Sequence, residues 1–273
     1  MKIESAPRLG IWSGAVYRHR VGLIALTIAS LTFLLYLLTL APGLTWRNSA
    51  SDGGDLLTAA FTWGIPHPTG YPTYLILLRG FSSIIPTGSV ALHGNLFSAI
   101  TASAAIGLLF MATVRILRSL PLSTGITDRY VLISAGVSSI SMAASRELWS
   151  QATVTEVYAL NTLFVSAILW ITLGLRDRQR NGGVGWRYGA SIGLLSGVAL
   201  GNHLTIAAVI LPLLAWGILG GGSRTLRVGH ALPIMVAGAL GLCVYAYAPI
   251  ASSQAPVLNW GHPDSLQGFW WMV

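Results

Sequence analysis

Apolar segments long enough to cross a lipid bilayer recur along the whole chain. A membrane-spanning helix needs about 17–25 consecutive, mostly apolar residues. Charged residues make up only 9% of these 273 residues, against about 25% in soluble domains. The candidate spans are residues 21–41, 91–114, 130–145, 155–175, 188–201, 203–219 and 229–250. The pattern therefore predicts an all-α, polytopic integral membrane protein with about seven transmembrane helices.

The basic residues predict how the chain is oriented in the bilayer, because lysine and arginine collect in the cytoplasmic loops of membrane proteins. If residues 1–20 form a cytoplasmic segment, 13 of the 16 lysines and arginines fall on the cytoplasmic side of the predicted spans. The first outer loop, residues 42–90, then faces the extracytoplasmic or lumenal side. The net charge of +8 is scattered in short runs between apolar segments, which argues against a nucleic-acid-binding face.

Two carboxylates, Asp52 and Asp55, lie in the first outer loop. Carboxylates near hydrocarbon are costly, so they mark functional sites by default. Asp52 is free to face a cavity, where it would take a proton from an attacking hydroxyl. Asp55 has two interpretations, a functional acid or a cap for a helix that begins near Leu56. Two carboxylates without a third ligand are a weak metal signal, so no cofactor is predicted and a divalent metal ion is left open.

A stiff loop, Pro66–Pro72, follows with the sequence PHPTGYP. Its three prolines restrict the backbone and Gly70 permits a sharp turn, so we expect a preorganised binding loop that carries His67 and Tyr71. In that interpretation His67 contacts a phosphate or a sugar, and the alternative is a rigid connector with an exposed histidine. Residues 71–86 are too short to span a bilayer and are expected to form a re-entrant or interfacial helix.

Aromatic and charged residues also join the third and fourth predicted spans. The residues of interest are Arg146, Trp149, Glu156 and Tyr158. Together they would suit a sugar-and-phosphate site, with a carboxylate for hydroxyls, an aromatic ring for the sugar face and an arginine for phosphate. The same residues are also typical of an interfacial aromatic belt with an acid in the first turn of a helix. The sequence leaves both interpretations open.

Asn202 and His203 interrupt the apolar stretch between the fifth and sixth predicted spans. Polar groups in such a stretch need hydrogen-bond partners. They either satisfy the ends of two short helices or line a cavity, and the sequence favours neither interpretation.

Four sequence blocks, taken in order, resemble the protein O-mannosyltransferase-like membrane family (transmembrane protein 260-like) of the GT-C glycosyltransferase superfamily. The blocks are DGGD at 52–55, HPTGYP at 67–72, Trp149 with EVY at 156–158, and GNHL at 201–204. The resemblance runs from about residue 25 to the end of the chain. Two positions depart from the family pattern, which usually has glutamate at Asp55 and proline at Thr69.

The resemblance implies a GT-C-type enzyme of protein glycosylation. Such an enzyme passes a sugar, here expected to be mannose, from a polyprenyl-phosphate donor to a hydroxyl of a protein or other acceptor on the non-cytoplasmic face. It implies that Asp52 is the essential base with Asp55 second, and that residues 21–273 are the N-terminal part of a longer GT-C-like domain. Positive charge for the phosphate would come from Arg146, His67 and His203.

Two other functions stay open at this point, a polytopic transporter or channel and a non-catalytic truncated membrane protein. A transporter is expected to carry ionisable residues at mid-membrane depth and paired broken helices. Here most ionisable residues lie at the ends of the predicted spans. The abrupt end at Val273 favours a truncated protein, whereas the intact acid blocks favour an enzyme.

Overall fold

A computed structural model describes residues 14–120, 127–183, 185–219 and 224–273. Within these residues the regular structure is helical, with one isolated β-bridge. The predicted all-α class is therefore confirmed. Most of the predicted N-terminal segment, residues 1–20, lies outside the described residues, and the part from Ala15 onward already belongs to the first long helix.

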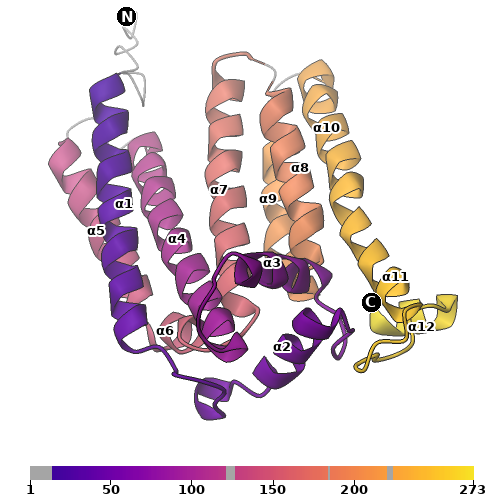
Figure 1. Cartoon of the computed structure of the whole chain (residues 1–273). Helices are drawn as coiled ribbons and strands as arrows, with labels where there is room; N and C mark the ends of the chain where they lie inside the picture. Colours follow the sequence, from indigo (N-terminus) through magenta and orange to yellow (C-terminus); the bar gives the residue numbers. More distant parts are fainter. Residues whose placement is uncertain (1–13, 121–126, 184, 220–223) are drawn as a thin grey trace, which may run out of the picture.

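Long helices run alongside one another as a bundle (Figure 1). They are α1 (Ala15–Leu38), α4 (Val90–Ser119), α5 (Asp128–Ala143), α7 (Tyr158–Arg180), α8 (Trp186–Leu200), α9 (Ala207–Leu219) and α10 (Arg224–Leu242). Each overlaps one of the predicted spans. Among the described residues, four stretches are long and apolar enough to cross a membrane: Ala15–Leu38, Val90–Ser119, Tyr158–Arg180 and Val228–Ser252. The count of about seven transmembrane helices stays a prediction.

Short helices gather where α1 ends and α4 begins (Figure 1). They are α2 (Gly53–Thr62), α3 (Pro72–Ser83), α6 (Arg146–Ala152), α11 (Tyr247–Ser252) and α12 (Leu266–Met272), with 3-10 turns at Arg47–Ser49, Leu204–Ile206 and Cys243–Ala246. We call this side of the bundle the loop end, and the side where α1 and α5 begin the opposite end. The short helix expected within residues 71–86 is present as α3, which lies across the loop end.

Two apolar clusters hold the bundle together. One joins α2, α3 and α7 through buried side chains that include Leu57, Leu78 and Ile168. The other joins α4 and α5 to α1, with Ile106 and Val131 among its buried members. The first cluster lies directly behind the loop end, so it fixes the position of the short helices that carry the acids.

Apolar side chains also cover the outside of the bundle. Leu26, Leu31, Met235 and Leu240 are 62–69% exposed. In water such a surface would be costly, and contiguous apolar patches of this kind are rare on soluble monomers. In a bilayer the outward side chains of a helix bundle face hydrocarbon, and all backbone groups are satisfied within the helices. The exposed apolar face therefore supports an integral membrane protein.

Glycines allow α8 and α10 to approach each other closely. A Cβ added at Gly193 would lie 2.2 Å from the carbonyl oxygen of Ile234, and one at Gly197 would lie 2.3 Å from that of Gly238. Small residues at helix interfaces permit such backbone approach within membranes. This packing positions the turn between α8 and α9 at the loop end.

Candidate active site

Asp52 stands at the start of α2 with a carboxylate that the helix does not use. It occupies the N-cap position, but its side chain accepts no hydrogen bond from the first turn. Its Oδ1 accepts a hydrogen bond from Ser51 Oγ at 3.0 Å. The side chain is 40% exposed. Asp52 is therefore an accessible carboxylate at a helix N-terminus, a position that the sequence analysis considered for Asp55 rather than for Asp52.

Asp55 holds the stiff loop in place. Its Oδ2 accepts a hydrogen bond from the backbone N–H of His67 at 2.9 Å and lies 2.6 Å from His67 Nδ1. An ionised carboxylate can only accept, so we assign the proton of this contact to Nδ1. Asp55 thus faces a loop 12 residues further along rather than the first turn of its own helix. Its observed contacts differ from those of the capping interpretation.

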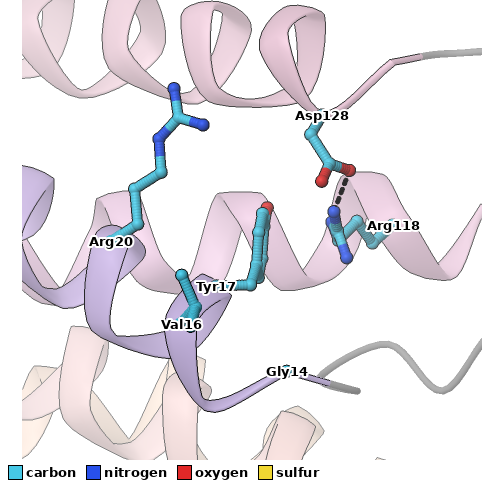
Figure 2. A pocket seen from close by; sticks show the side chains of 6 residues that line it. All are labelled: Gly14, Val16, Tyr17, Arg20, Arg118 and Asp128. Carbon is cyan, nitrogen blue, oxygen red and sulfur yellow. Dashed lines mark hydrogen bonds and ion pairs between the residues drawn. The ribbon is translucent and has the colours of Figure 1, made fainter.

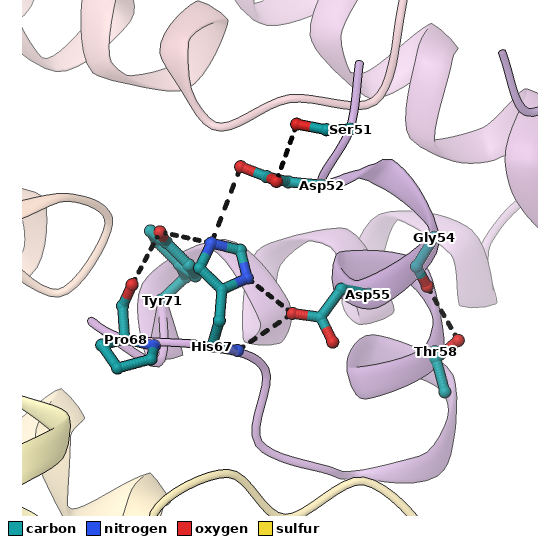
Figure 3. A network of polar contacts seen from close by, with 8 residues as sticks. All are labelled: Ser51, Asp52, Gly54, Asp55, Thr58, His67, Pro68 and Tyr71. Atoms are coloured by element: carbon teal, nitrogen blue, oxygen red, sulfur yellow. Dashed lines mark hydrogen bonds and ion pairs between the residues drawn. The ribbon is translucent and has the colours of Figure 1, made fainter. Parts of the chain in front are cut away.

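His67 lies between two carboxylates and a hydroxyl (Figure 3). Its Nε2 is 2.9 Å from the Tyr71 hydroxyl and 3.6 Å from Asp52 Oδ2. The hydroxyl is also 3.1 Å from the carbonyl oxygen of Pro68. Since a hydroxyl has one proton, it donates either to that carbonyl or to Nε2, and in the first case Nε2 must itself be protonated. The same contacts therefore accommodate neutral and protonated His67.

Tyr71 contributes a protonated hydroxyl and a fixed turn. Burial raises the pKa of Tyr71, and the charge of Asp52 adds to the effect, so the hydroxyl keeps its proton at neutral pH. Gly70 and Tyr71 both have positive φ, +74° and +45°, and α3 begins at the next residue, Pro72. The left-handed region is uncommon for a residue other than glycine and persists where the surroundings hold it. The expected sharp turn is present, and a part for the loop as a preorganised binding loop stays a prediction.

The C-terminal part of the chain braces the backbone that leads into this loop. The Ile65 N–H donates to the carbonyl oxygen of Leu258 at 2.8 Å, and the Trp260 N–H donates to that of Ile65 at 3.1 Å. The Tyr247 hydroxyl donates to the carbonyl oxygen of Gly64 at 2.8 Å. The loop is therefore fixed from both directions along the chain, which keeps its histidine in one orientation.

Tyr158 and His203 extend the cluster on its α7 and α8 side. The His203 ring lies 5.7 Å from the Tyr71 ring and 5.6 Å from the Tyr158 ring, between centroids. Its Nδ1 accepts a hydrogen bond from the Thr205 N–H at 3.2 Å. Burial, followed by the charge of His67, lowers the pKa of His203. At neutral pH His203 would therefore contact a phosphate as a neutral hydrogen-bonding group.

Asn202 is fully buried and joins the end of α8 to the start of α7. Its Nδ2 donates to the carbonyl oxygen of Val157 at 3.1 Å and to Asn161 Oδ1 at 2.6 Å. Of the two interpretations that the sequence leaves open, these contacts fit the one in which Asn202 satisfies helix ends. A part for Asn202 in substrate binding stays a prediction.

Glu156 is an acid enclosed beside Asp52. It is 2% exposed, in the turn that precedes α7. Burial, with the charge of Asp52 second, raises the pKa of Glu156 to about 7, and the backbone N–H groups of Asp52 and Val157 offset part of that effect. Acids whose pKa is shifted this far cluster at functional sites. Glu156 therefore adds a third carboxyl to those of Asp52 and Asp55.

Arg146 and Trp149 lie apart from these residues. The Trp149 Nε1 donates to Thr39 Oγ1 at 2.9 Å, and its ring is 6.4 Å from that of Tyr36. Arg146 is exposed at the start of α6. Among the described residues, neither forms a hydrogen bond, ion pair or ring contact with Asp52, Asp55 or His67. Their role in binding a sugar or a phosphate stays a prediction.

Asn95 is a positioning residue that the sequence analysis missed. From within α4 its Nδ2 donates to the carbonyl oxygens of Ala41 and Gly43 at 2.8 and 3.2 Å, and its Oδ1 accepts from Thr155 Oγ1 at 2.7 Å. It therefore joins the first outer loop to the segment that carries Glu156. The signal was available, because an amide inside an apolar helix needs partners.

A cavity of about 360 Å³ lies at the opposite end, away from all of these acids (Figure 2). Its lining residues are Gly14, Val16, Tyr17, Arg20, Arg118 and Asp128. Arg118 pairs with Asp128 and lies over the Tyr17 ring, 3.8 Å from its centroid. Among the described residues, no group of three or more His, Cys, Asp or Glu side chains could hold a metal ion.

Comparison with known proteins identifies relatives of this sequence. The profile of the family described as "Protein O-mannosyl-transferase TMEM260 N-terminal domain" matches residues 52–226. Protein O-mannosyl-transferase TMEM260 of Mus musculus is 31% identical over 263 residues, which are 95% of this chain and 34% of the relative. The protein of that name from Dictyostelium discoideum is 24% identical over 259 residues, 89% of this chain and 30% of the relative.

The chain thus spans about a third of the length of the curated relatives it matches. No solved structure matches it. The matched region begins at Asp52 and contains the stiff loop, Glu156 and the turn between α8 and α9. It therefore includes Asp52, Asp55, His67, Tyr71, Glu156, Tyr158 and His203, which we call the acid–histidine cluster.

Proposed function

Because this chain belongs to the family of the protein O-mannosyl-transferase TMEM260 N-terminal domain, we propose that it transfers mannose from a polyprenyl-phosphate donor to an acceptor hydroxyl at the loop end of the bundle. The observation that carries the proposal is the position of His67 between Asp55 and Asp52 (Figure 3). Acid–base catalysis of sugar transfer to a hydroxyl needs two kinds of group. One is an accessible carboxylate, and the other is a histidine that a second carboxylate orients.

The contacts of the two aspartates give them different roles. Asp55 is engaged by the backbone and the ring of His67, and its side chain is 22% exposed. Asp52 is 40% exposed, and its closest approach to the His67 ring is 3.6 Å. Asp52 is therefore the base that faces the acceptor. Asp55 orients His67 and stabilises its protonated form.

In the proposed transfer step, Asp52 and His67 account for the proton that moves and for the charge that develops. Asp52 takes the proton of the acceptor hydroxyl while the hydroxyl oxygen forms a bond to the anomeric carbon of mannose. The bond from that carbon to the phosphate oxygen breaks, and the polyprenyl phosphate leaves with the electron pair. Protonated His67 supplies positive charge close to the developing phosphate. One direct displacement of this kind inverts the configuration at the anomeric carbon.

The distribution of basic residues supports a site on the non-cytoplasmic face. The loop between α1 and α4 carries the acids, whereas most of the lysines and arginines fall in segments on the other side of the predicted spans. A donor anchored by a polyprenyl chain must react close to the bilayer surface. Short helices packed across one end of a membrane bundle provide such a position (Figure 1).

Transfer from labelled polyprenyl-phosphate mannose in membranes that express this chain tests the proposal. We expect the wild type to form a covalent product and Asp52→Asn to lower the rate by about 10²–10⁴-fold, the usual contribution of a general base. The matched control is Asp264→Asn at the loop end, where the carboxylate accepts a hydrogen bond from Ser252 Oγ at 3.1 Å. The control should stay within about twofold of the wild type.

Full activity of Asp52→Asn would remove Asp52 from the role of base. A correctly inserted wild type that neither binds the donor nor forms a product would overturn the transferase proposal. Movement of a solute across proteoliposomes without a covalent product would select a transporter instead.

A further inference from the structure

The backbone of Glu156 is fixed by α4. Its N–H donates to Ser98 Oγ at 3.4 Å, and the same hydroxyl lies 3.4 Å from the Glu156 carbonyl oxygen. One residue earlier, the Thr155 hydroxyl donates to Asn95. The side chain of Glu156 is therefore placed by the framework of the bundle rather than by a mobile loop.

The carboxyl group of Glu156 is enclosed, and the backbone N–H groups of Asp52 and Val157 interact with it only weakly. Neither oxygen has a hydrogen-bond partner of ordinary geometry, and both are shielded from solvent. Among the described residues, no lysine, arginine or histidine forms an ion pair with it. An ionised carboxylate in that position costs several kcal/mol, whereas a protonated carboxyl costs much less. The enclosure therefore favours the protonated form.

The segment of Asp52 packs directly on the segment of Glu156. A Cβ added at Gly53 would lie 3.2 Å from the Thr155 carbonyl oxygen, so the two backbones leave little room for a methyl group between them. The negative charge of Asp52 is the second cause, after burial, of the raised pKa of Glu156. Two neighbouring carboxyls in a poorly solvated place do not ionise independently, and one of them keeps its proton.

The groups that surround this pair do not supply a compensating fixed charge. The side chains of Tyr71 and Tyr74 on the α3 side and of Tyr158 on α7 all experience the charge of Glu156. The two histidines of the cluster contact the tyrosines: His67 lies 2.9 Å from the Tyr71 hydroxyl, and the His203 ring lies against the rings of Tyr71 and Tyr158.

We propose that Glu156 and Asp52 form a coupled carboxyl pair, in which the buried Glu156 keeps the proton and Asp52 stays ionised at the accessible position. Glu156 is then a positioning residue that acts through Asp52, whose part as the base rests on the proposed function. While Glu156 is protonated, Asp52 is the single negative charge of the pair. Once Glu156 ionises, the site gains a second negative charge that repels the phosphate of the donor.

Infrared spectroscopy of the purified chain in detergent tests the pair without any substrate. The carbonyl stretch of a protonated carboxylic acid is followed while the pH is raised. We expect a band that disappears with a midpoint of about 7 in the wild type and is missing in Glu156→Gln. In Asp52→Asn the midpoint should fall by about one pH unit, because a neighbouring like charge is removed.

The matched control is Asp264→Asn, which should leave both the band and its midpoint unchanged. A wild type without a protonated carboxyl band below neutral pH would overturn the proposal. So would a midpoint that is the same in wild type and Asp52→Asn, since the two carboxyls would then be independent. Because this measurement needs no donor, its result does not depend on whether mannose transfer is observed.

A second readout separates this role from a merely structural one when transfer is active. Glutamine has the shape and the donor capacity of a protonated glutamic acid. Glu156→Gln should therefore match the wild type at acidic pH. Above the midpoint, the KM for the donor should rise about tenfold in the wild type, as for one unfavourable charge interaction, and stay flat in the variant. Equal pH profiles of KM in the two proteins would overturn the proposal.

Discussion

The two ends of the bundle each hold an ion pair beside a tyrosine, and the surroundings of the pairs differ. At the loop end the pair is His67 with Asp55, and at the opposite end it is Arg118 with Asp128. The first pair lies in the stiff loop and α2, and the C-terminal segment braces the backbone that leads into this loop. The second borders an open cavity of about 360 Å³ (Figure 2).

The groups next to the two pairs also differ. Asp52 lies beside His67 and Glu156 lies beside Asp52, whereas Arg20 lines the cavity beside the Arg118–Asp128 pair. Histidine exchanges its proton near neutral pH, and arginine keeps its charge throughout. The loop end is therefore equipped to move protons, and the opposite end holds a fixed positive charge. The cavity of about 360 Å³ and the cluster of Asp52, Asp55 and His67 therefore lie at different ends of the bundle.

Asp55→Asn sharpens this comparison most. The variant loses the carboxylate that holds the His67 ring and backbone, so under the proposed function we expect mannose transfer to fall by about 10²-fold. The equivalent change at the opposite end, Asp128→Asn, should leave transfer within about twofold. Both rates are measured with labelled donor in membranes. A similar loss in the two variants would show that the ends do not differ in function.

Gly94→Ala tests how tightly the loop end is clamped. An added Cβ would lie 2.3 Å from Thr155 Oγ1 and displace the contact of Thr155 with Asn95. We expect a loss of about 1–3 kcal/mol in the free energy of unfolding. In Gly136→Ala on α5 nothing lies within 4 Å of the new methyl group. That control should be neutral or stabilise by up to about 1 kcal/mol. The stabilities of Gly94→Ala and Gly136→Ala are compared by thermal unfolding in detergent. Equal stability of the two variants would show that the packing of Gly94 against Thr155 does not hold the loop end together.

Glu156→Gln tests the loop end through the pH dependence of stability. The folded protein holds the Glu156 proton more tightly than the unfolded chain, since its pKa is raised from 4.5 to about 7. This contribution to stability is complete below about pH 4.5 and is lost as the pH rises through about 7. The melting temperature of the wild type should therefore fall relative to the variant across that window. A constant difference between the two melting curves would contradict the prediction.

Asp128→Asn should have the smallest effect on stability. The Asp128 side chain is 56% exposed, and exposed ion pairs contribute up to about 1 kcal/mol. Arg118 keeps its contact with the Tyr17 ring in the variant. We expect a loss below about 1 kcal/mol that shrinks further in high salt, because exposed charges are screened. A loss of several kcal/mol would mean that the opposite end is as firmly held as the loop end.

The helices were predictable from the sequence because hydropathy is a local property. Each predicted span overlaps a helix, and the boundaries differ by a few residues; α1, for example, begins at Ala15 rather than at residue 21. The turn at Gly70 and Tyr71 was predictable as well, since it follows from the proline and glycine of its own segment. These features depend on neighbours in the sequence.

The pairing within the site was not predictable from local pattern. Packing between separate segments decides that Asp55 holds His67. It also decides that Glu156 is enclosed beside Asp52. The sequence placed Arg146 and Glu156 in one possible group, yet α6 carries Arg146 outward while Glu156 turns into the bundle. Spacing along the chain does not distinguish these outcomes, because a helix of two turns separates the two residues.

The brace on the stiff loop has a consequence for how the protein is made. Gly64 and the hydroxyl of Tyr247 that binds it are 183 residues apart in the sequence. At a synthesis rate of about 5–20 residues per second, the loop must wait roughly 10–40 s for its partner. During that interval Asp55 and His67 are already synthesised, but the backbone that leads into their loop lacks its brace. The nascent chain therefore completes the contacts around this loop late, after most of its helices have been synthesised.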